Sequence, residues 1–206
     1  MAVILCFGDS NTYGAPADDP EFARLPYDVR WTGQLQTILG VGHRVIEEGL
    51  NGRTTDLDHA DRPYCHGRRF FVVSLLSHAP IDVVVVMLGS NDLKAEFDRP
   101  VEDIAGALDG YLDDVSVHAP GAAAVLVSPI HIDDSQPLFA EWTSAEFDAD
   151  SVAKSRRLAD GIRRVARAWD TMFLDAATVA RAGGDGLHLS LDSQRSLARA
   201  IAALVS

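Results

Sequence analysis

Short apolar runs alternate along the chain with stretches in which apolar residues recur at helical spacing. Residues 83–86 are four consecutive valines. Such a β-branched run is typical of a strand that is buried on both faces of a sheet. On this pattern we expect five strands, at residues 3–7, 44–48, 81–88, 123–128 and 171–175.

Helical spacing of apolar residues is clearest in three stretches between and after these runs. Residues 70–76 are apolar all round, and their place between two strands favours a crossover helix. Residues 130–143 carry acidic residues and a proline, so we expect an irregular surface loop there. The periodic positions are Val101, Ile104, Ala105, Leu108, Leu112 and Val115; Leu158, Ile162, Val165 and Trp169; and Leu197, Ile201 and Leu204.

Strands joined by helical crossovers indicate a parallel sheet with helices on both faces. The chain has 206 residues, which is enough for a single well-buried core. It contains no internal repeat, low-complexity tract or linker. We therefore predict one α/β domain spanning residues 1–206.

The net charge of the chain and the length of its apolar stretches exclude several classes of partner. Thirty acidic residues against 18 basic ones give a formal charge of −12, which would repel the phosphate backbone of a nucleic acid. The longest strongly apolar stretch, residues 81–88, is far shorter than the ~20 residues of a membrane span. Two cysteines cannot build a disulfide framework, and residues 1–7 lack the basic start of a signal peptide. We expect a cytoplasmic protein.

Polar clusters follow four of the predicted strands. Gly8-Asp9-Ser10 follows the first, Gly49 the second and Gly89-Ser90-Asn91-Asp92 the third, and Asp185-Gly186-Leu187-His188 comes shortly after the fifth. The carboxyl ends of parallel strands share one edge of the sheet, where ligands bind. Residues that lie far apart in sequence are therefore expected to converge there.

These clusters contain the groups that acyl transfer needs. Ser10 is a poor nucleophile unless a base takes its proton, and His188 can be that base. Asp185 can orient the imidazole and stabilise its charged form. The backbone amides of Ser10 and Gly49 and the side-chain amide of Asn91 can supply an oxyanion hole.

Other interpretations of these residues remain open from the sequence. Ser10 could simply cap a helix, and the stretch after the first strand could bind a phosphate, as in a flavodoxin-like FMN module. The chain lacks the common nucleotide-binding fingerprints G-x-x-x-x-G-K-[ST] and G-x-G-x-x-G. Metal-capable side chains occur between Asp58 and His66, but their spacing fits no closed zinc site. We expect neither a metal nor a cofactor.

In order, the four clusters resemble the sequence blocks of the SGNH (GDSL-like) hydrolases, over nearly the whole chain. Residues 29–33 (VRWTG), 47–50 (EEGL) and 53–55 (RTT) are similar to the arylesterase/acyltransferase branch. The resemblance implies a flavodoxin-like three-layer α/β/α sandwich. It also implies a metal-free esterase in which Ser10 is the nucleophile, His188 the base and Asp185 its orienting group, with an oxyanion hole of Ser10, Gly49 and Asn91.

The expected function is hydrolysis of small carboxylic esters, such as acetyl or aryl esters, through an acyl-enzyme. An acyltransferase or a carbohydrate acetylesterase would use the same residues, so both remain alternatives. The expected partner is a small-molecule ester. A homo-oligomer is compatible with the sequence, which does not specify the number of subunits.

Overall fold

The computed structural model describes residues 1–19 and 24–206, and it is built on a sheet of five parallel strands. Their order across the sheet is β2-β1-β3-β4-β5. This confirms the predicted parallel sheet and the position of every predicted strand. The strands are β1 Ala2–Gly8, β2 His43–Gly49, β3 Val83–Met87, β4 Ala123–Ser128 and β5 Met172–Asp175.

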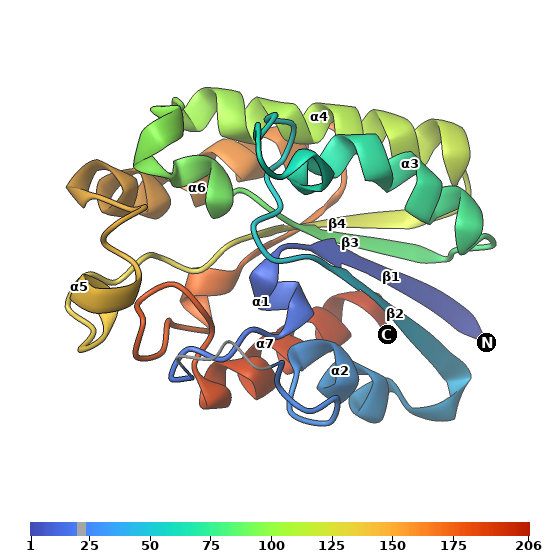
Figure 1. The fold of residues 1–206 in the computed structure, drawn as a ribbon. Helices are drawn as coiled ribbons and strands as arrows, with labels where there is room; N and C mark the ends of the chain where they lie inside the picture. Colours follow the sequence, from blue (N-terminus) through green and yellow to red (C-terminus); the bar gives the residue numbers. More distant parts are fainter. Residues whose placement is uncertain (20–23) are drawn as a thin grey trace.

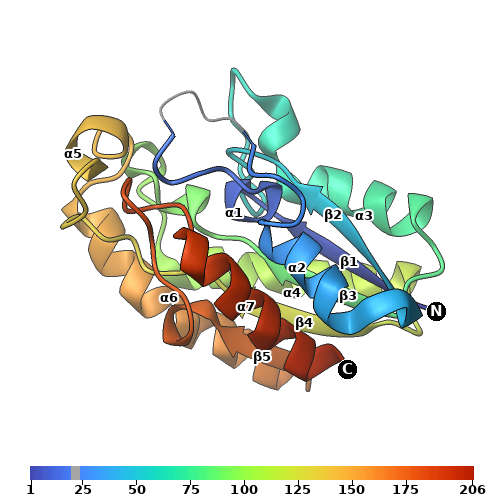
Figure 2. The same ribbon diagram turned by 90° about the horizontal axis from the view of Figure 1, so that it is seen from below.

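Helices cover both faces of the sheet. Figures 1 and 2 show α3, α4 and α6 on one face and α2 and α7 on the other, while the short α1 lies at the carboxyl end of β1. The expected three-layer sandwich is therefore confirmed. The helices are α1 Ser10–Tyr13, α2 Trp31–Leu39, α3 Gly67–Ser77, α4 Val101–His118, α5 Phe139–Trp142, α6 Ala149–Ala168 and α7 Leu191–Val205. Short 3-10 helices are η1 Gly40–Gly42, η2 Pro63–Cys65, η3 Asn91–Leu93, η4 Ala95–Phe97 and η5 Ala176–Thr178.

The interior strand β1, which lies between β2 and β3, illustrates how the sequence builds two cores. Side chains along a strand point alternately to opposite faces. Leu5 and Phe7 join the cluster under α3, α4 and α6, while Ile4 and Cys6 join the cluster under α2 and α7. All four are fully buried. β1 is therefore held from both sides, and its carboxyl end is a rigid support for the residues that follow.

Two helices differ from the sequence-based expectation. The helix α2, which begins at Trp31, was not among the predicted elements. It has as many polar as apolar residues, and Trp31 and Leu35 are its only large apolar side chains that are fully buried. The single turn α5 interrupts the segment expected to be irregular. No helix in the described ranges is long and apolar enough to cross a membrane.

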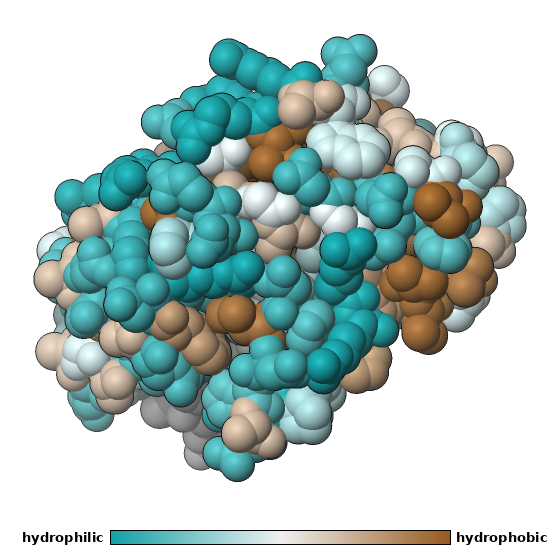
Figure 3. Space-filling view, turned by 90° about the horizontal axis from the view of Figure 1, so that it is seen from above, coloured by the Kyte–Doolittle hydropathy of each residue, from teal (hydrophilic) through white to brown (hydrophobic). Residues whose placement is uncertain are grey.

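The surface over α3 and α4 is mostly hydrophilic (Figure 3). Apolar side chains are exposed along one side of α3, where Phe70, Val73 and Leu76 follow one another at a spacing of three residues. This face lies away from the carboxyl edge of the sheet, where the predicted site residues lie.

Candidate active site

Ser10 is the first residue of α1, and only Asp9 separates it from the end of β1. The preceding Asp9 caps this helix, because its Oδ1 accepts the N–H of Asn11 at 2.9 Å. The chain therefore turns sharply from strand to helix at Ser10. The buried Ser10 side chain lines a cavity at this edge of the sheet.

His188 and Asp185 lie in the loop between β5 and α7. The Nε2 of His188 is 2.9 Å from the Oγ of Ser10, although the two residues are 178 positions apart. The Nδ1 of His188 is 2.5 Å from Oδ2 of Asp185. The other carboxylate oxygen, Oδ1, accepts the backbone N–H groups of Leu187 and His188, each at 2.9 Å. Both carboxylate oxygens of Asp185 are thus used to orient the imidazole and its loop.

Asn11, which the sequence analysis did not assign to the site, joins the two halves of this arrangement. Its Oδ1 accepts the N–H of Leu189 at 2.8 Å, and its Nδ2 donates to the carbonyl of Leu187 at 3.3 Å. These bonds bracket His188 on both sides and fix it beside Ser10. The signal in the sequence was a side-chain amide, with both a donor and an acceptor, directly after the candidate nucleophile.

A cavity of about 350 Å³ opens beside these residues. Four of its lining residues were predicted from the sequence, and the others, which come from several separate segments, were not. The predicted ones are Ser10, Asn91, Asp185 and His188; the others are Ala15, Asn51, Gly52, Arg62, Lys94, Trp142, Thr143, Glu146, Phe147 and Leu187.

Gly49, the glycine expected to donate to an oxyanion, does not line this cavity. It is the last residue of β2, and the next residue, Leu50, donates its N–H to Gly8 in β1 at 3.1 Å. Successive residues of a strand direct their N–H groups to opposite sides. The Gly49 N–H therefore points away from β1 and Ser10. A Cβ here would lie 2.1 Å from the amide nitrogen of Tyr13, so glycine is required for the close approach of α1.

Gly52, three residues later, does line the cavity. Its φ of +79° lies in the left-handed region, which favours glycine. No acceptor in the described residues takes its N–H. The neighbouring Asn91 donates one Nδ2 hydrogen to the carbonyl of Arg53 at 3.1 Å, which holds the Asn91 amide against this loop.

Arg53 holds the loop after β2 against the end of the sheet. Its guanidinium group lies 4.0 Å over the ring of Phe7, and its Nη1 donates to the carbonyl of Gly8 at 2.8 Å and to the carbonyl of Glu48. One buried side chain therefore connects the end of β1, the end of β2 and the loop that contains Gly52.

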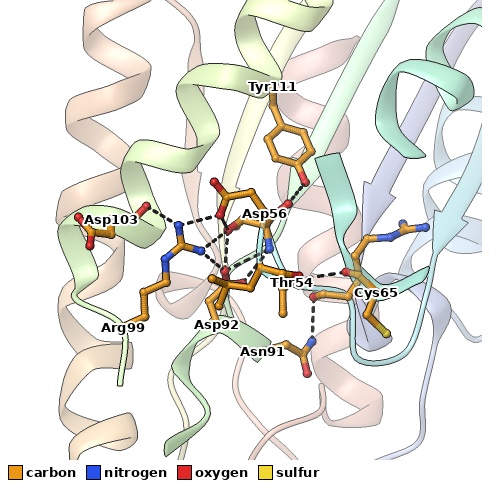
Figure 4. A network of polar contacts seen from close by, with 11 residues as sticks. Thr54, Asp56, Cys65, Asn91, Asp92, Arg99, Asp103 and Tyr111 are labelled. Carbon is orange, nitrogen blue, oxygen red and sulfur yellow. Dashed lines mark hydrogen bonds and ion pairs between the residues drawn. The ribbon is translucent and has the colours of Figure 1, made fainter. Parts of the chain in front are cut away.

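Asp92 forms a second connection between the Asn91 turn and the same loop (Figure 4). This fully buried carboxylate accepts the N–H of Thr55 at 2.9 Å and its hydroxyl at 2.5 Å. Arg99 donates to Asp92 at 2.7 Å and also pairs with Asp56 at 2.7 Å. Burial raises the pKa of Asp92, and the bonds from Thr55 and Arg99 oppose that shift. Asp92 is thus a structural carboxylate beside the site.

Asp9 is the other buried carboxylate near Ser10. Burial raises its pKa to about 6, against the opposing effects of the Asn11 N–H and the charges of His188 and Arg53. Because its Oδ1 is bonded to the backbone of α1, Asp9 holds the turn that presents Ser10.

The metal-capable side chains between residues 58 and 66 do not form a cluster. Asp58 pairs with Arg69 at 2.6 Å, and His59 faces Glu96 at 3.8 Å. Within the described ranges, no group of three or more His, Cys, Asp or Glu side chains is arranged to hold a metal ion.

Comparisons with known proteins agree with this geometry. Residues 6–195 match the model of the GDSL-like Lipase/Acylhydrolase family. No curated protein matches the chain. An aryl esterase from M. smegmatis with a bound inhibitor is 34% identical, with a TM-score of 0.92, and the match covers 100% of this chain and 98% of that one. Est24, a carbohydrate acetylesterase from Sinorhizobium meliloti, is 32% identical with a TM-score of 0.91 and the same coverage.

A putative arylesterase from Agrobacterium tumefaciens is 31% identical, with a TM-score of 0.82 and coverage of 100% and 98%. The family match spans all four polar clusters, and these three structures cover the whole chain. The chain therefore belongs to the GDSL-like lipase/acylhydrolase (SGNH) family of esterases.

Proposed function

We propose that this protein is a serine esterase that hydrolyses small carboxylic esters, such as acetyl and aryl esters, through Ser10, His188 and Asp185. The observation that carries the proposal is the continuous contact from Asp185 to His188 to Ser10, at 2.5 and 2.9 Å, on the wall of a cavity.

In the first step, Nε2 of His188 takes the proton of Ser10 as Oγ attacks the carbonyl carbon of the ester. Nδ1–H of His188 donates to Asp185, which stabilises the imidazolium that forms. The same imidazolium then gives its proton to the departing alkoxide or phenoxide. The product of this half-reaction is an acyl group bound to Ser10.

The negative oxygen of the tetrahedral intermediate needs hydrogen-bond donors that are already in place. We assign this role to the amide of Ser10, the free Nδ2 hydrogen of Asn91 and the amide of Gly52. Gly52 replaces Gly49, because only Gly52 lies on the cavity. Water, activated by His188, then attacks the acyl group and releases Ser10.

Two finer alternatives use the same residues. Transfer of the acyl group to an alcohol requires only that an alcohol replace water in the second step. Removal of acetyl groups from carbohydrate is favoured by one structural relative, a carbohydrate acetylesterase, and by Trp142 in the cavity wall, since aromatic rings stack on sugars. An FMN-binding module, the alternative from another class, does not agree with membership of an acylhydrolase family. A cytoplasmic location and a homo-oligomer stay predictions.

The experiment is covalent labelling with a fluorophosphonate, followed by peptide mapping and activity measurements on phenyl acetate. We expect label on Ser10, and loss of about 10⁶-fold in kcat for Ser10→Ala, the scale known for such triads. Ser144→Ala, a serine beside the cavity residue Thr143, is the matched control and should retain both label and activity. Label on another residue, or an active Ser10→Ala protein, would refute the proposal.

A further inference from the structure

The cavity beside Ser10 contains two cations that the proposed reaction does not use. Lys94 follows Asn91 by three residues, and its side chain is only 4% exposed. Its Nζ is 2.8 Å from Oε2 of Glu146. An ammonium group has three N–H donors, and the described residues provide no second acceptor for it. A buried ammonium group on a cavity wall therefore retains unused donors.

Arg62 lies on the same wall, beside the proposed oxyanion loop. Its Nη1 is 3.3 Å from the position that a Cβ on Gly52 would occupy, and the Sγ of Cys65 is 3.4 Å from the same point. Both Arg62 and Lys94 lower the pKa of the Cys65 thiol, which burial raises, so both cations are near it. Arg62 has no ion-pair partner in the described part of the chain.

Two carboxylates also line the cavity, so its formal charge is zero in a molecule whose formal charge is −12. These carboxylates are committed to other groups. Asp185 is bonded to His188 and to two backbone N–H groups, and Glu146 is paired with Lys94. Among the described residues, neither carboxylate forms an ion pair with Arg62. Neutral acetyl or phenyl groups would make no use of this guanidinium group.

We infer that the substrate is an ester that carries a second, ionised carboxylate group, which binds between Arg62 and Lys94. This inference rests on the proposed esterase function and specifies its substrate class. The carboxylate could belong to the acyl part or to the alcohol part of the ester, since both leave Ser10 through the same cavity.

The test uses two pairs of esters that differ only in charge. Phenyl hydrogen glutarate and phenyl glutaramate place a carboxylate or its neutral amide on the acyl side. 3-Acetoxybenzoate and 3-acetoxybenzamide place it on the alcohol side. For each pair we measure the ratio of kcat/KM for the charged ester to that for the neutral one, after subtraction of uncatalysed hydrolysis. We expect a ratio above one for at least one pair, and that pair identifies the side.

Two substitutions should move this ratio in opposite directions. Arg62→Gln removes the unpaired cation and should lower the ratio about fivefold, the upper range for an exposed pair. Glu146→Gln frees Lys94 and should raise the ratio by a similar factor. Arg199→Gln, an exposed arginine of α7 outside the cavity, is the matched control and should leave the ratio at its wild-type value.

The outcomes separate this inference from the function on which it rests. Equal ratios in the wild type, Arg62→Gln and Glu146→Gln proteins overturn the inference alone, provided that the neutral esters are hydrolysed through Ser10. The inference is also overturned if Arg199→Gln lowers the ratio of charged to neutral ester hydrolysis as much as Arg62→Gln does. Failure to hydrolyse any of the four esters, with Ser10 unlabelled, overturns the esterase proposal and this inference together.

Discussion

The side-chain amide of Asn91 has two N–H donors, and one of them is used by the carbonyl of Arg53. If the other stabilises the oxyanion, Asn91→Ala should lower kcat about 10²–10³-fold, with a much smaller change in KM. Steady-state kinetics on phenyl acetate measures both. Asn51→Ala, which changes another asparagine of the cavity wall, is the control. A kcat equal to that of the wild type would remove Asn91 from the proposed mechanism.

The raised pKa of Asp9 predicts how the free energy of unfolding changes with pH. Its folded pKa of about 6 lies above the ordinary value of 3.8, so the folded protein binds the extra proton more tightly than the unfolded chain does. The free energy of unfolding therefore falls as pH rises from about 4 to about 6, where Asp9 ionises more readily in the unfolded chain, and the effect of Asp9 is constant above that range. Asp9→Asn keeps an Oδ1 acceptor for Asn11 but has no charge.

We expect Asp9→Asn to gain stability relative to the wild type as pH rises from 4 to 7, by about 2 kcal/mol. Urea unfolding at each pH measures the difference. Asp18→Asn, on an aspartate that accepts the N–H of Gly184 in an exposed position, is the control and should show no such trend. A constant difference across this range would mean that the pKa of Asp9 is the same in the folded and unfolded states, which contradicts the prediction.

Some site residues could be predicted from sequence and others could not, for a physical reason. The spacing of Gly-Asp-Ser and Asp-x-x-His identified residues that the structure brings together at Ser10 and His188. Gly49 ends β2 and Gly52 follows three residues later, and only the path of the backbone decides which of the two lines the cavity. Lys94 and Glu146 are 52 positions apart, and nothing local marks them as a pair.

At the scale of elements, the connection between η3 and the loop after β2 depends on Asp92. Asp92→Ala would leave the N–H and hydroxyl of Thr55 without their buried acceptor and would remove one partner of Arg99. We expect a loss of about 3 kcal/mol in the free energy of unfolding, the scale for breaking a buried ion pair. Denaturant unfolding measures this loss.

Asp56→Ala is the comparison for Asp92→Ala, because Asp56 pairs with the same Arg99 from a position that is 33% exposed. It should cost about 1 kcal/mol or less. If both variants lost the same stability, burial of the carboxylate would not be the important factor, and the proposed role of Asp92 in joining the two loops would fail.

Four strands, β1, β3, β4 and β5, could be predicted because each is an apolar run that leads into polar or glycine residues; in β2 only Val45 and Ile46 are apolar. The order of the strands in the sheet, β2-β1-β3-β4-β5, could not be predicted from any single apolar run, because it depends on the direction of each crossover between strands. The helix α2 escaped prediction because its core contacts come from few positions, and Trp31 is held by partners distant in sequence. Its N–H donates to Gln194 of α7, and its Nε1 donates to the carbonyl of Asn11.

For the whole molecule, the dominant electrostatic property is the excess of 30 acidic over 18 basic residues. Repulsion among these charges opposes the compact state, and salt screens it. We expect the melting temperature to rise by a few degrees when NaCl is raised from about 10 to 300 mM, over which the screening length falls from roughly 30 to under 8 Å. A melting temperature that falls with salt would show that attractive ion pairs outweigh the repulsion.

The distance of 178 positions between Ser10 and His188 has a consequence for folding. Four strands, β2 to β5, lie between these residues in the sequence. The hydroxyl and the imidazole therefore meet only after these strands have joined β1 in one sheet. Under the proposed mechanism, recovery of ester hydrolysis after dilution from denaturant would thus report assembly of the whole sheet rather than of any single element.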